Sequence, residues 1–287
     1  MKALVIARLT FREAFRRKVI WGVALLSLIF VVFFAFGFHL IIQDFDQQAA
    51  RQAADPRAGG PFFTRDVQAS LMVLLGLYTV NFLAGIMTIF ASVGAIAGEV
   101  ESGTLHAIVP KPLGRWEIVL GKYLGHAAMI AIYISVMVGA VALIAREMAG
   151  YHVPQLTHGL LLMILVALIL LSLTMLGSTF LSTVANGVVV FMFYGMAATG
   201  GLVEQVGTSL NNETLTRIGV ISSVLVPSDS MWRLASYLTQ PRLANLFIGP
   251  NPFGTSIPPS PFAVHYAMGY CAVLFVGAVL VFRYRDL

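Results

Sequence analysis

The chain has 287 residues, of which 58% are apolar and only 11% are charged, and its formal net charge is +5. A soluble domain has about a quarter charged residues, so this composition excludes a water-covered globular protein and most of the surface is expected to face lipid. The basic residues cluster at the edges of apolar runs, which is typical of membrane proteins and argues against a nucleic-acid partner. Cys271 is the one cysteine, which excludes an intrachain disulfide and a multi-cysteine metal site.

The first eighteen residues are basic and amphipathic. On a helix, Leu4, Ala7, Phe11 and Phe15 fall on one stripe, and a row of arginines lies beside it, namely Arg8, Arg12 and Arg16. A helix with this pattern lies in the headgroup layer, with its arginines toward anionic lipid. Residues 1–18 therefore predict an interfacial helix, although a simple positive-inside anchor for the next segment has the same composition.

Six apolar segments are long enough to cross a bilayer. A hydrocarbon core of about 30 Å needs roughly 20 apolar residues in a helix, because backbone polar groups must be paired within the segment. The first segment is too long for a cleavable signal peptide and is expected to be retained. The predicted spans are Val19–Ile42, Val67–Ala97, Tyr123–Ala145, Gly159–Thr183, Gly187–Val203 and Ala263–Phe282. The sequence thus predicts an all-α polytopic membrane protein with one transmembrane domain over residues 1–287.

The distribution of lysine and arginine predicts the orientation. Short segments at the N-terminus, between the second and third spans and at the C-terminus carry most of the basic residues. The remaining arginines lie mostly in long loops, which count less in the positive-inside rule. Both termini are therefore expected in the cytoplasm. The first outer segment, residues 43–66, is expected to prolong the helix of the first span before the break at Gly59-Gly60-Pro61.

The segment 98–122 is longer than a connector between two spans needs to be. Glu99 and Glu101 end the second span, and the residues that follow predict a turn and a short helix that Pro110 and Pro112 stop. The run from Arg115 to Lys122 then leads into the third span. This pattern fits a short cytoplasmic helix held at a fixed angle, and it also fits an ordinary amphipathic loop.

The segment 204–262 is expected to be a long extracytoplasmic loop, with Glu204 at the membrane interface. Seven of the twelve prolines lie in it, and Pro227-Ser228-Asp229-Ser230 predicts the start of a short helix. We expect this helix to lie on the outer membrane surface or to cap the bundle. A loop of this length is usually functional or has structure of its own.

Polar residues inside the spans are expected to face the bundle interior, because lipid-facing polar groups are costly. The favoured interpretation is interhelical hydrogen bonding, and the alternative is a translocation path. These positions are Asn81, Ser172, Thr174, Ser178 and Asn186. Two glycine pairs, Gly94-x-x-x-Gly98 and Gly121-x-x-x-Gly125, either let helices approach closely or let the backbone bend.

Several kinds of chemistry are not indicated. The six histidines are scattered without metal-ligand spacing, so no metal site is predicted. No Gly-x-Ser-x-Gly motif and no convergent acid-base set occur, which disfavours a membrane enzyme. No Gly-x-x-x-x-Gly-Lys-Ser/Thr phosphate loop occurs either, so the chain is not expected to bind ATP productively.

The pattern Glu99-x-Glu101-x-Gly103-Thr104-Leu105, followed by Pro112-x-x-Arg115 and Gly121-Lys122, resembles the coupling region of ABC type-2 transporter permeases. The basic N-terminal helix, six spans, long last outer loop and basic C-terminus are similar too, so the resemblance covers essentially the full chain. It implies a permease homodimer or heterodimer that binds two separate ATPase subunits, which hold ATP and Mg, so that this chain has no cofactor. The resemblance also implies that a coupling helix and an N-terminal elbow helix touch those subunits. The residues carried over by position are Glu99, Glu101, Gly103, Thr104, Leu105 and Arg115 for coupling, and Arg8, Phe11, Arg12, Phe15 and Arg16 for the elbow.

The function that the resemblance implies is that of a non-catalytic permease subunit, which couples ATP hydrolysis on a partner to substrate movement in the cytoplasmic membrane of a prokaryote. Export is expected over import. The alternative is a membrane anchor or mechanical transmitter, which drives an extracytoplasmic partner without moving a solute. In that case the segment 204–262 would be the output surface.

Overall fold

The computed structural model describes residues 2–16, 18–55, 63–101, 114–241, 253–255 and 257–284, with all side chains in these ranges except those at positions 2, 15, 16, 19, 100 and 101. Every regular element in them is an α-helix, which confirms the predicted class. The helices are α1 (Lys2–Arg16), α2 (Lys18–Ala54), α3 (Arg65–Ser92), α4 (Ala97–Glu101), α6 (Arg115–Ala149), α7 (Leu156–Ser178), α8 (Thr183–Ser209), α9 (Glu213–Leu225), α10 (Ser228–Leu238) and α12 (Phe262–Tyr284).

Six helices are long and apolar enough to cross a membrane, and each corresponds to one predicted span: α2, α3, α6, α7, α8 and α12. Four of them extend beyond the predicted span at both ends, whereas α3 ends at Ser92 and α7 at Ser178, before the predicted ends Ala97 and Thr183. Helix α2, which contains the first span, continues to Ala54, as expected. Helix α6 begins at Arg115, so the charged residues that precede the third span are themselves helical. Polar residues with good helix propensity continue a helix until a glycine or proline interrupts it.

The segment 204–262 differs from the predicted loop. Helix α8 continues to Ser209, and α9 then runs back along it as a helical hairpin. The short helix predicted from residue 228 is present as α10, and its contacts fit the second of the two expected placements, a helix that caps the bundle. It packs against α3, α7, α8 and α12 because its apolar face, which includes Met231, Trp232 and Ala235, is fully buried.

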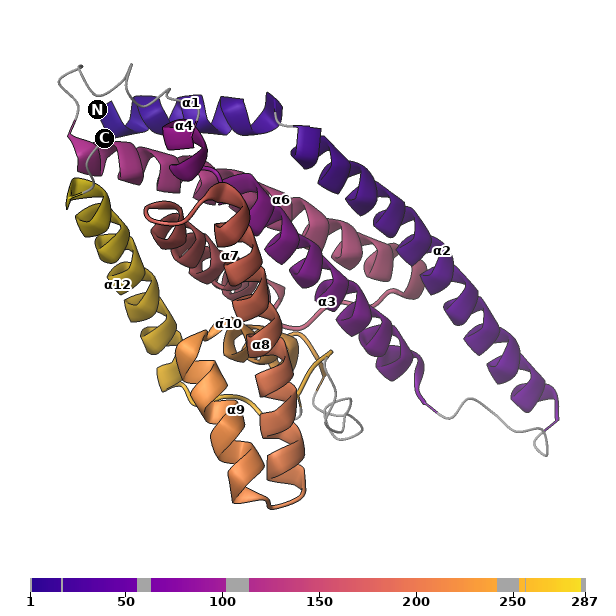
Figure 1. Ribbon diagram of the computed structural model, residues 1–287. Helices are drawn as coiled ribbons and strands as arrows, with labels where there is room; N and C mark the ends of the chain where they lie inside the picture. The colour runs from indigo at the N-terminus through magenta and orange to yellow at the C-terminus, as the bar shows by residue number, and fades with distance from the viewer. Residues whose placement is uncertain are drawn as a thin grey trace.

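Both termini lie at one end of the bundle, which we call the terminal end (Figure 1). Helix α1 lies across this end, along the first part of α6. The opposite end, where α8 turns into α9, is called the distal end. Helix α2 runs along the outside of the bundle beside α3 and α6, and α12 lies on another side, against α7.

The core is formed by α3, α6 and α7, which pack against one another. Leu77, Ile134 and Ile169, one from each helix, are fully buried. The outer helices α2 and α12 instead expose large apolar side chains, such as Phe33 at 70% and Val273 at 71%. A soluble protein rarely exposes apolar surface on this scale, so these faces suit contact with lipid or with another membrane helix.

Candidate functional site

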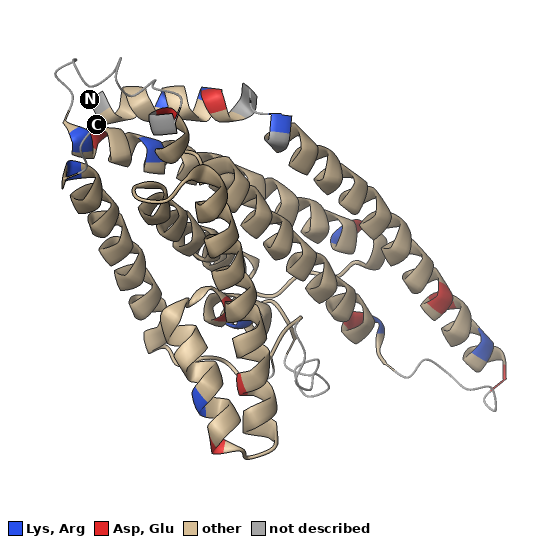
Figure 2. Cartoon of the chain, in the orientation of Figure 1, with Lys and Arg blue, Asp and Glu red and all other residues tan. Residues whose placement is uncertain are grey.

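Charged residues gather at the helix ends and around α10, and most of the length of the spans is uncharged (Figure 2). Two groups of charged residues are buried within the part of the chain that the structure describes. The first lies at the terminal end, around the residues predicted to couple the chain to an ATPase. The second lies toward the distal end, around α10.

Helix α1 lies against α6 because two glycines of α6 leave room for it. A methyl group built on Gly121 would lie 2.7 Å from the carbonyl oxygen of Ala3, and one built on Gly125 would lie 2.7 Å from that of Ala7. Small residues at this spacing let two helix backbones approach closely. The Gly121–Gly125 pair is therefore a helix contact. A methyl group on Gly98, in contrast, would meet only Thr183, at 3.8 Å.

The face that α1 buries differs from the predicted stripe. Leu4 is 68% exposed, whereas Thr10 and Ala14 are buried at 6% and 2%. Thr10 also lies against Gly125, where a methyl group would meet its side chain. Small side chains let α1 approach the glycine-lined surface of α6 more closely than leucine would. The buried face of α1 therefore lies about one residue toward the N-terminus from the predicted stripe.

The predicted elbow residues divide into exposed cations and a packed aromatic. Arg8 and Arg12 are exposed, while Phe11 is half-buried against the core. The helix thus presents arginines outward along the terminal end. The side chains of Phe15 and Arg16 lie outside the described residues.

Glu99 and Lys122 form an ion pair that joins α4 to α6. Lys122 Nζ lies 2.5 Å from Glu99 Oε1, and the two side chains are 7% and 18% exposed. The imidazole of His126, one turn further along α6, contacts the carbonyl oxygen of Lys122 at 2.8 Å and that of Ala91, in the last turn of α3, at 3.0 Å. These contacts fix the end of α3 and all of α4 against α6.

Arg115 joins the start of α6 to the end of α12. Its Nη1 donates to the carbonyl oxygens of Phe282 at 3.2 Å and of Arg283 at 3.0 Å. A helix leaves its last four carbonyl groups without partners, and a cation there also complements the helix dipole. The remaining coupling residues are outside the description: Gly103, Thr104 and Leu105 in segment 102–113, and the side chain of Glu101 at the end of α4.

Asn186 is the most constrained of the polar residues in the spans. Its Nδ2 donates to the carbonyl oxygens of Thr174 at 3.0 Å and of Val93 at 3.2 Å. It is fully buried, and Gly177 leaves the space that its side chain occupies. Asn186 thus ties the turn between α7 and α8 to the end of α3.

The other polar positions in the spans make hydrogen bonds or line a cavity. Ser172 lies 3.0 Å from the hydroxyl of Tyr123 on α6, which is an interhelical contact. Thr174 and Ser178 donate to carbonyl oxygens of their own helix at 2.6 and 2.9 Å. Asn81 lines a cavity between α3, α8 and α10.

Toward the distal end, Arg233 of α10 lies between two carboxylates. Its Nη2 is 2.8 Å from Glu204 Oε2, and its Nε is 3.0 Å from Asp229 Oδ2. The Arg233 and Asp229 side chains are 6% and 11% exposed, and that of Glu204 is 22% exposed. Ser223 of α9 also donates to Glu204 at 3.3 Å. This cluster, called the distal cluster, therefore holds α8, α9 and α10 together.

Burial governs the protonation of Asp229. Desolvation raises the pKa of this carboxyl to about 7, the neighbouring Arg233 opposes the rise, and Glu204 adds to it. For Arg233 the two carboxylates outweigh the burial, and its pKa is raised. The guanidinium therefore stays charged, while the Asp229 carboxyl titrates near neutral pH.

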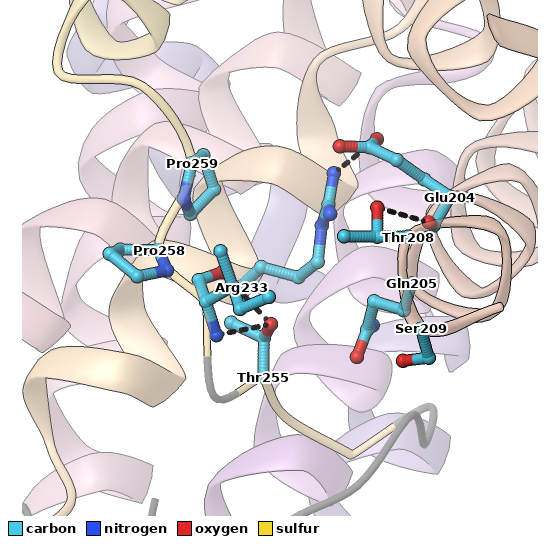
Figure 3. Close-up of a pocket in the computed structure, with 9 residues that line it drawn as sticks. Glu204, Gln205, Thr208, Ser209, Arg233, Thr255, Pro258 and Pro259 are labelled. Carbon is cyan, nitrogen blue, oxygen red and sulfur yellow. Dashed lines mark hydrogen bonds and ion pairs between the residues drawn. The ribbon is translucent and has the colours of Figure 1, made fainter. Parts of the chain in front are cut away.

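A small polar cavity of about 70 Å³ opens beside Arg233 (Figure 3). Glu204 and Thr208 face it from α8, and Thr255 and Pro258 face it from the segment before α12. Thr208 donates its hydroxyl to the carbonyl oxygen of Glu204 at 2.9 Å. Within the described ranges, no three His, Cys, Asp or Glu side chains are placed to hold a metal ion. The cavity can thus accept water or a small polar group.

Sequence reasoning placed Glu204 at a membrane interface and did not predict the distal cluster. One signal was available, because Asp229 and Arg233 are four residues apart and such pairs face one another on a helix. Their partner Glu204 is brought in by the fold, since it lies 29 residues from Arg233.

Comparison with known proteins identifies the family of this chain. The profile described as "ABC-2 family transporter protein" matches residues 4–287. Two similar relatives are each described as "Probable ABC transporter permease protein NosY", from Stutzerimonas stutzeri at 35% identity and from Pseudomonas aeruginosa at 38% identity, both over 86 residues. In each case the matched segment makes up 30% of this chain and 30% of the relative.

Proposed function

This chain belongs to the ABC-2 family of transporter proteins, and from this premise we propose that it is the membrane-spanning permease subunit of an ABC transporter. It works with a separate ATPase that binds ATP and Mg, and with a second copy of itself or a sister permease. The chain itself carries out no covalent chemistry, and its own work is to convert movement of the ATPase into movement of its spans.

The observation that carries this proposal is a set of contacts that joins the helices of the terminal end to one another. Segment 102–113 is flanked by α4 and α6, and the Glu99–Lys122 ion pair joins these two helices at 2.5 Å. Arg115 joins α6 to α12, and α1 lies in the glycine-lined surface of α6. A force applied beside segment 102–113 would therefore reach α3, α6, α12 and α1 together, as a coupling device requires.

The charges support the proposed orientation, and the direction of transport is part of the proposal. The terminal end carries the exposed Arg8 and Arg12, and cytoplasmic segments are enriched in such cations. We place both termini in the cytoplasm, in the cytoplasmic membrane of a prokaryote. We take the direction to be export. We place the path along α3 and α8, where Asn81 lines a cavity.

The test is reconstitution with the ATPase of the same transporter in lipid nanodiscs. Glu99→Lys places two cations side by side in a buried site, so it should remove most of the ATPase stimulation that the permease provides. The matched control is Glu213→Lys on α9, whose side chain is 84% exposed and lies at the other end of the molecule. Normal stimulation with Glu99→Lys, or no association with any ATPase, would contradict the proposal.

A second candidate is a mechanical transmitter without solute flux. The α8–α9 hairpin favours it, since the hairpin projects at the distal end beyond α10 (Figure 1) and exposes apolar side chains such as Ile221 at 60%. Proteoliposomes distinguish the two functions. ATP-dependent flux of a solute supports the permease, and ATP-dependent binding of a protein to the hairpin without flux supports the transmitter.

A further inference from the structure

A cavity of about 110 Å³ lies between α3, α8 and α10. Five aromatic side chains and one carboxylate line it: Tyr78 and Phe82 from α3, Phe191 and Tyr194 from α8, and Trp232 and Asp229 from α10. At about 30 Å³ per water molecule, this volume equals about four water molecules, which matches the four non-hydrogen atoms of a trimethylammonium head, and the rest of a ligand would lie toward the open side of the cavity. Asp229 is the one charged residue among those that line this cavity.

The aromatic rings are held in place by one another. The ring centroids of Tyr78 and Trp232 are 5.7 Å apart, and those of Phe82 and Tyr194 are 6.5 Å apart in a stacked pair. Tyr194 also donates its hydroxyl to the carbonyl oxygen of Asn81 at 3.5 Å. Rings fixed in this way present faces and edges to the cavity. The face of an aromatic ring attracts a cation within about 6 Å of its centroid.

The charge balance around Asp229 leaves a negative charge beside the cavity. Arg233 is shared between Glu204, at 2.8 Å, and Asp229, at 3.0 Å, and neither Arg233 nor Glu204 lines this cavity. With Asp229 ionised, the three side chains carry two negative charges and one positive charge. Because one guanidinium serves two carboxylates, the group keeps a net negative charge that attracts a cation entering from the aromatic side.

Two further polar groups at the cavity have no hydrogen-bond partner within the described part of the chain. They are Trp232 Nε1 and Ser228 Oγ, whose residues are 3% and 1% exposed. A buried donor without a partner costs about 1–3 kcal/mol, and a hydroxyl or other acceptor on a bound molecule would satisfy the indole N–H. The site thus offers a cage for a cation and, beside it, a donor for an oxygen atom.

We propose that this cavity binds a small organic cation, namely an alkylated ammonium group that carries a hydroxyl one or two carbons away. The ammonium group lies among the aromatic rings beside Asp229, and the hydroxyl accepts from Trp232. The inference concerns binding alone and does not depend on the proposed permease function.

Binding of this kind depends on pH in a defined direction. The groups that face Asp229 are Glu204 and Tyr194 on α8, Arg233 on α10 and Tyr78 on α3. Since the pKa of Asp229 is raised to about 7, lowering the pH protonates the carboxyl and removes the charge that attracts the ligand. If only the ionised form binds, the affinity should fall roughly tenfold from pH 8 to pH 6.

The test uses choline and its uncharged isostere 3,3-dimethylbutan-1-ol, with the full chain in lipid nanodiscs. The three tryptophans are Trp21, Trp116 and Trp232, so a Trp21→Phe/Trp116→Phe background leaves Trp232 as the sole fluorescent reporter. Choline should change its emission saturably, and the isostere should bind at least about tenfold more weakly, because it lacks the charge that the rings and carboxylate attract. Tetramethylammonium, without a hydroxyl, should bind more weakly than choline.

Two variants separate binding from folding. Asp229→Asn keeps the shape of the side chain and should abolish the pH dependence and most of the affinity for choline. Phe191→Leu changes a ring that is 48% exposed and should weaken binding about threefold to tenfold. Phe180→Leu is its matched control, since Phe180 is 58% exposed and does not line this cavity.

Some results would overturn the proposal. One is equal binding of choline and its isostere, and another is binding of neither choline nor tetramethylammonium. Unchanged choline affinity in Asp229→Asn would also overturn it. Because binding is measured without an ATPase, these results are independent of whether the chain stimulates nucleotide hydrolysis.

Discussion

Gly219 of α9 packs directly against Glu204 of α8, so that a methyl group built on the glycine would lie 2.7 Å from the glutamate's Cα. This contact sets the separation of the two helices of the distal hairpin. It also sets the position from which the Glu204 carboxylate reaches Arg233 at 2.8 Å. The distal cluster therefore depends on backbone packing as well as on charge.

Replacement of Gly219 should disturb the distal cluster. Gly219→Ala introduces a methyl group where backbone atoms of α8 lie, and overpacking of this kind typically costs about 1–3 kcal/mol. We expect a lower thermal unfolding midpoint in detergent and faster hydrogen exchange in α9. Gly195→Ala on α8 is the control, because nothing lies within 4 Å of a methyl group built there. Equal midpoints for the two variants would show that α9 is not held by this contact.

Removing one partner of the Glu99–Lys122 ion pair should destabilise the protein more than removing both. In Lys122→Met the carboxylate, which is 18% exposed, loses its cation. Leaving a buried charge unpaired costs more than the pair itself contributes, so we expect a loss of about 2 kcal/mol. The double variant Lys122→Met/Glu99→Gln should recover much of it. The thermal midpoints of the wild type, both single variants and the double variant form the required cycle. A double variant less stable than Lys122→Met would contradict this account.

The spans could be predicted from sequence because their signal is local. A long apolar run can satisfy its backbone in lipid only as a helix, so the length of each run sufficed. The start of α10 was equally local, since Pro227 and Ser228 mark a helix beginning. Helix α9 was missed because the prolines of segment 204–262 were taken to indicate a loop, although all of them lie at or after Pro227. A local signal for α9 was present, since Asn212 caps the helix by accepting from the backbone N–H groups of Thr214 and Leu215.

The contacts of charged residues could not be predicted in the same way. Arg115 was assigned to a partner by its place in a motif, and the structure gives it carbonyl oxygens of α12, more than 160 residues away. Glu204 likewise finds Arg233 only after α8, α9 and α10 have packed. Long-range pairing depends on helix positions that no periodicity within one segment encodes. The family profile supplied the class of protein, whereas these contacts required coordinates.

Stability should fall as the pH rises from 5 to 7 on account of Asp229. Its pKa is raised to about 7 in the folded protein, compared with about 3.9 in an unfolded chain. Between these values the folded protein holds a proton that the unfolded chain has released, so stability declines with increasing pH and levels off above 7. One group changes stability by at most about 1.4 kcal/mol per pH unit. Unfolding midpoints at pH 5, 6, 7 and 8 should decline more steeply for the wild type than for Asp229→Asn. Parallel profiles would mean that this carboxyl does not titrate in that range.

Asn186 should act as a structural connector and not as a substrate contact. Its Nδ2 donates to the carbonyl oxygens of Thr174 and Val93, and Asn186→Ala leaves both without this donor, at a cost of about 1–3 kcal/mol. Asn186→Asp should be more damaging, because it replaces the donor with a negative charge opposite two carbonyl oxygens. The order of thermal midpoints should therefore be wild type, then Asn186→Ala, then Asn186→Asp. A residue that only lined an aqueous path would give nearly equal midpoints, since an aspartate in water costs little, and a change there would alter flux. Midpoints that remain equal while transport selectivity changes would assign Asn186 to the path.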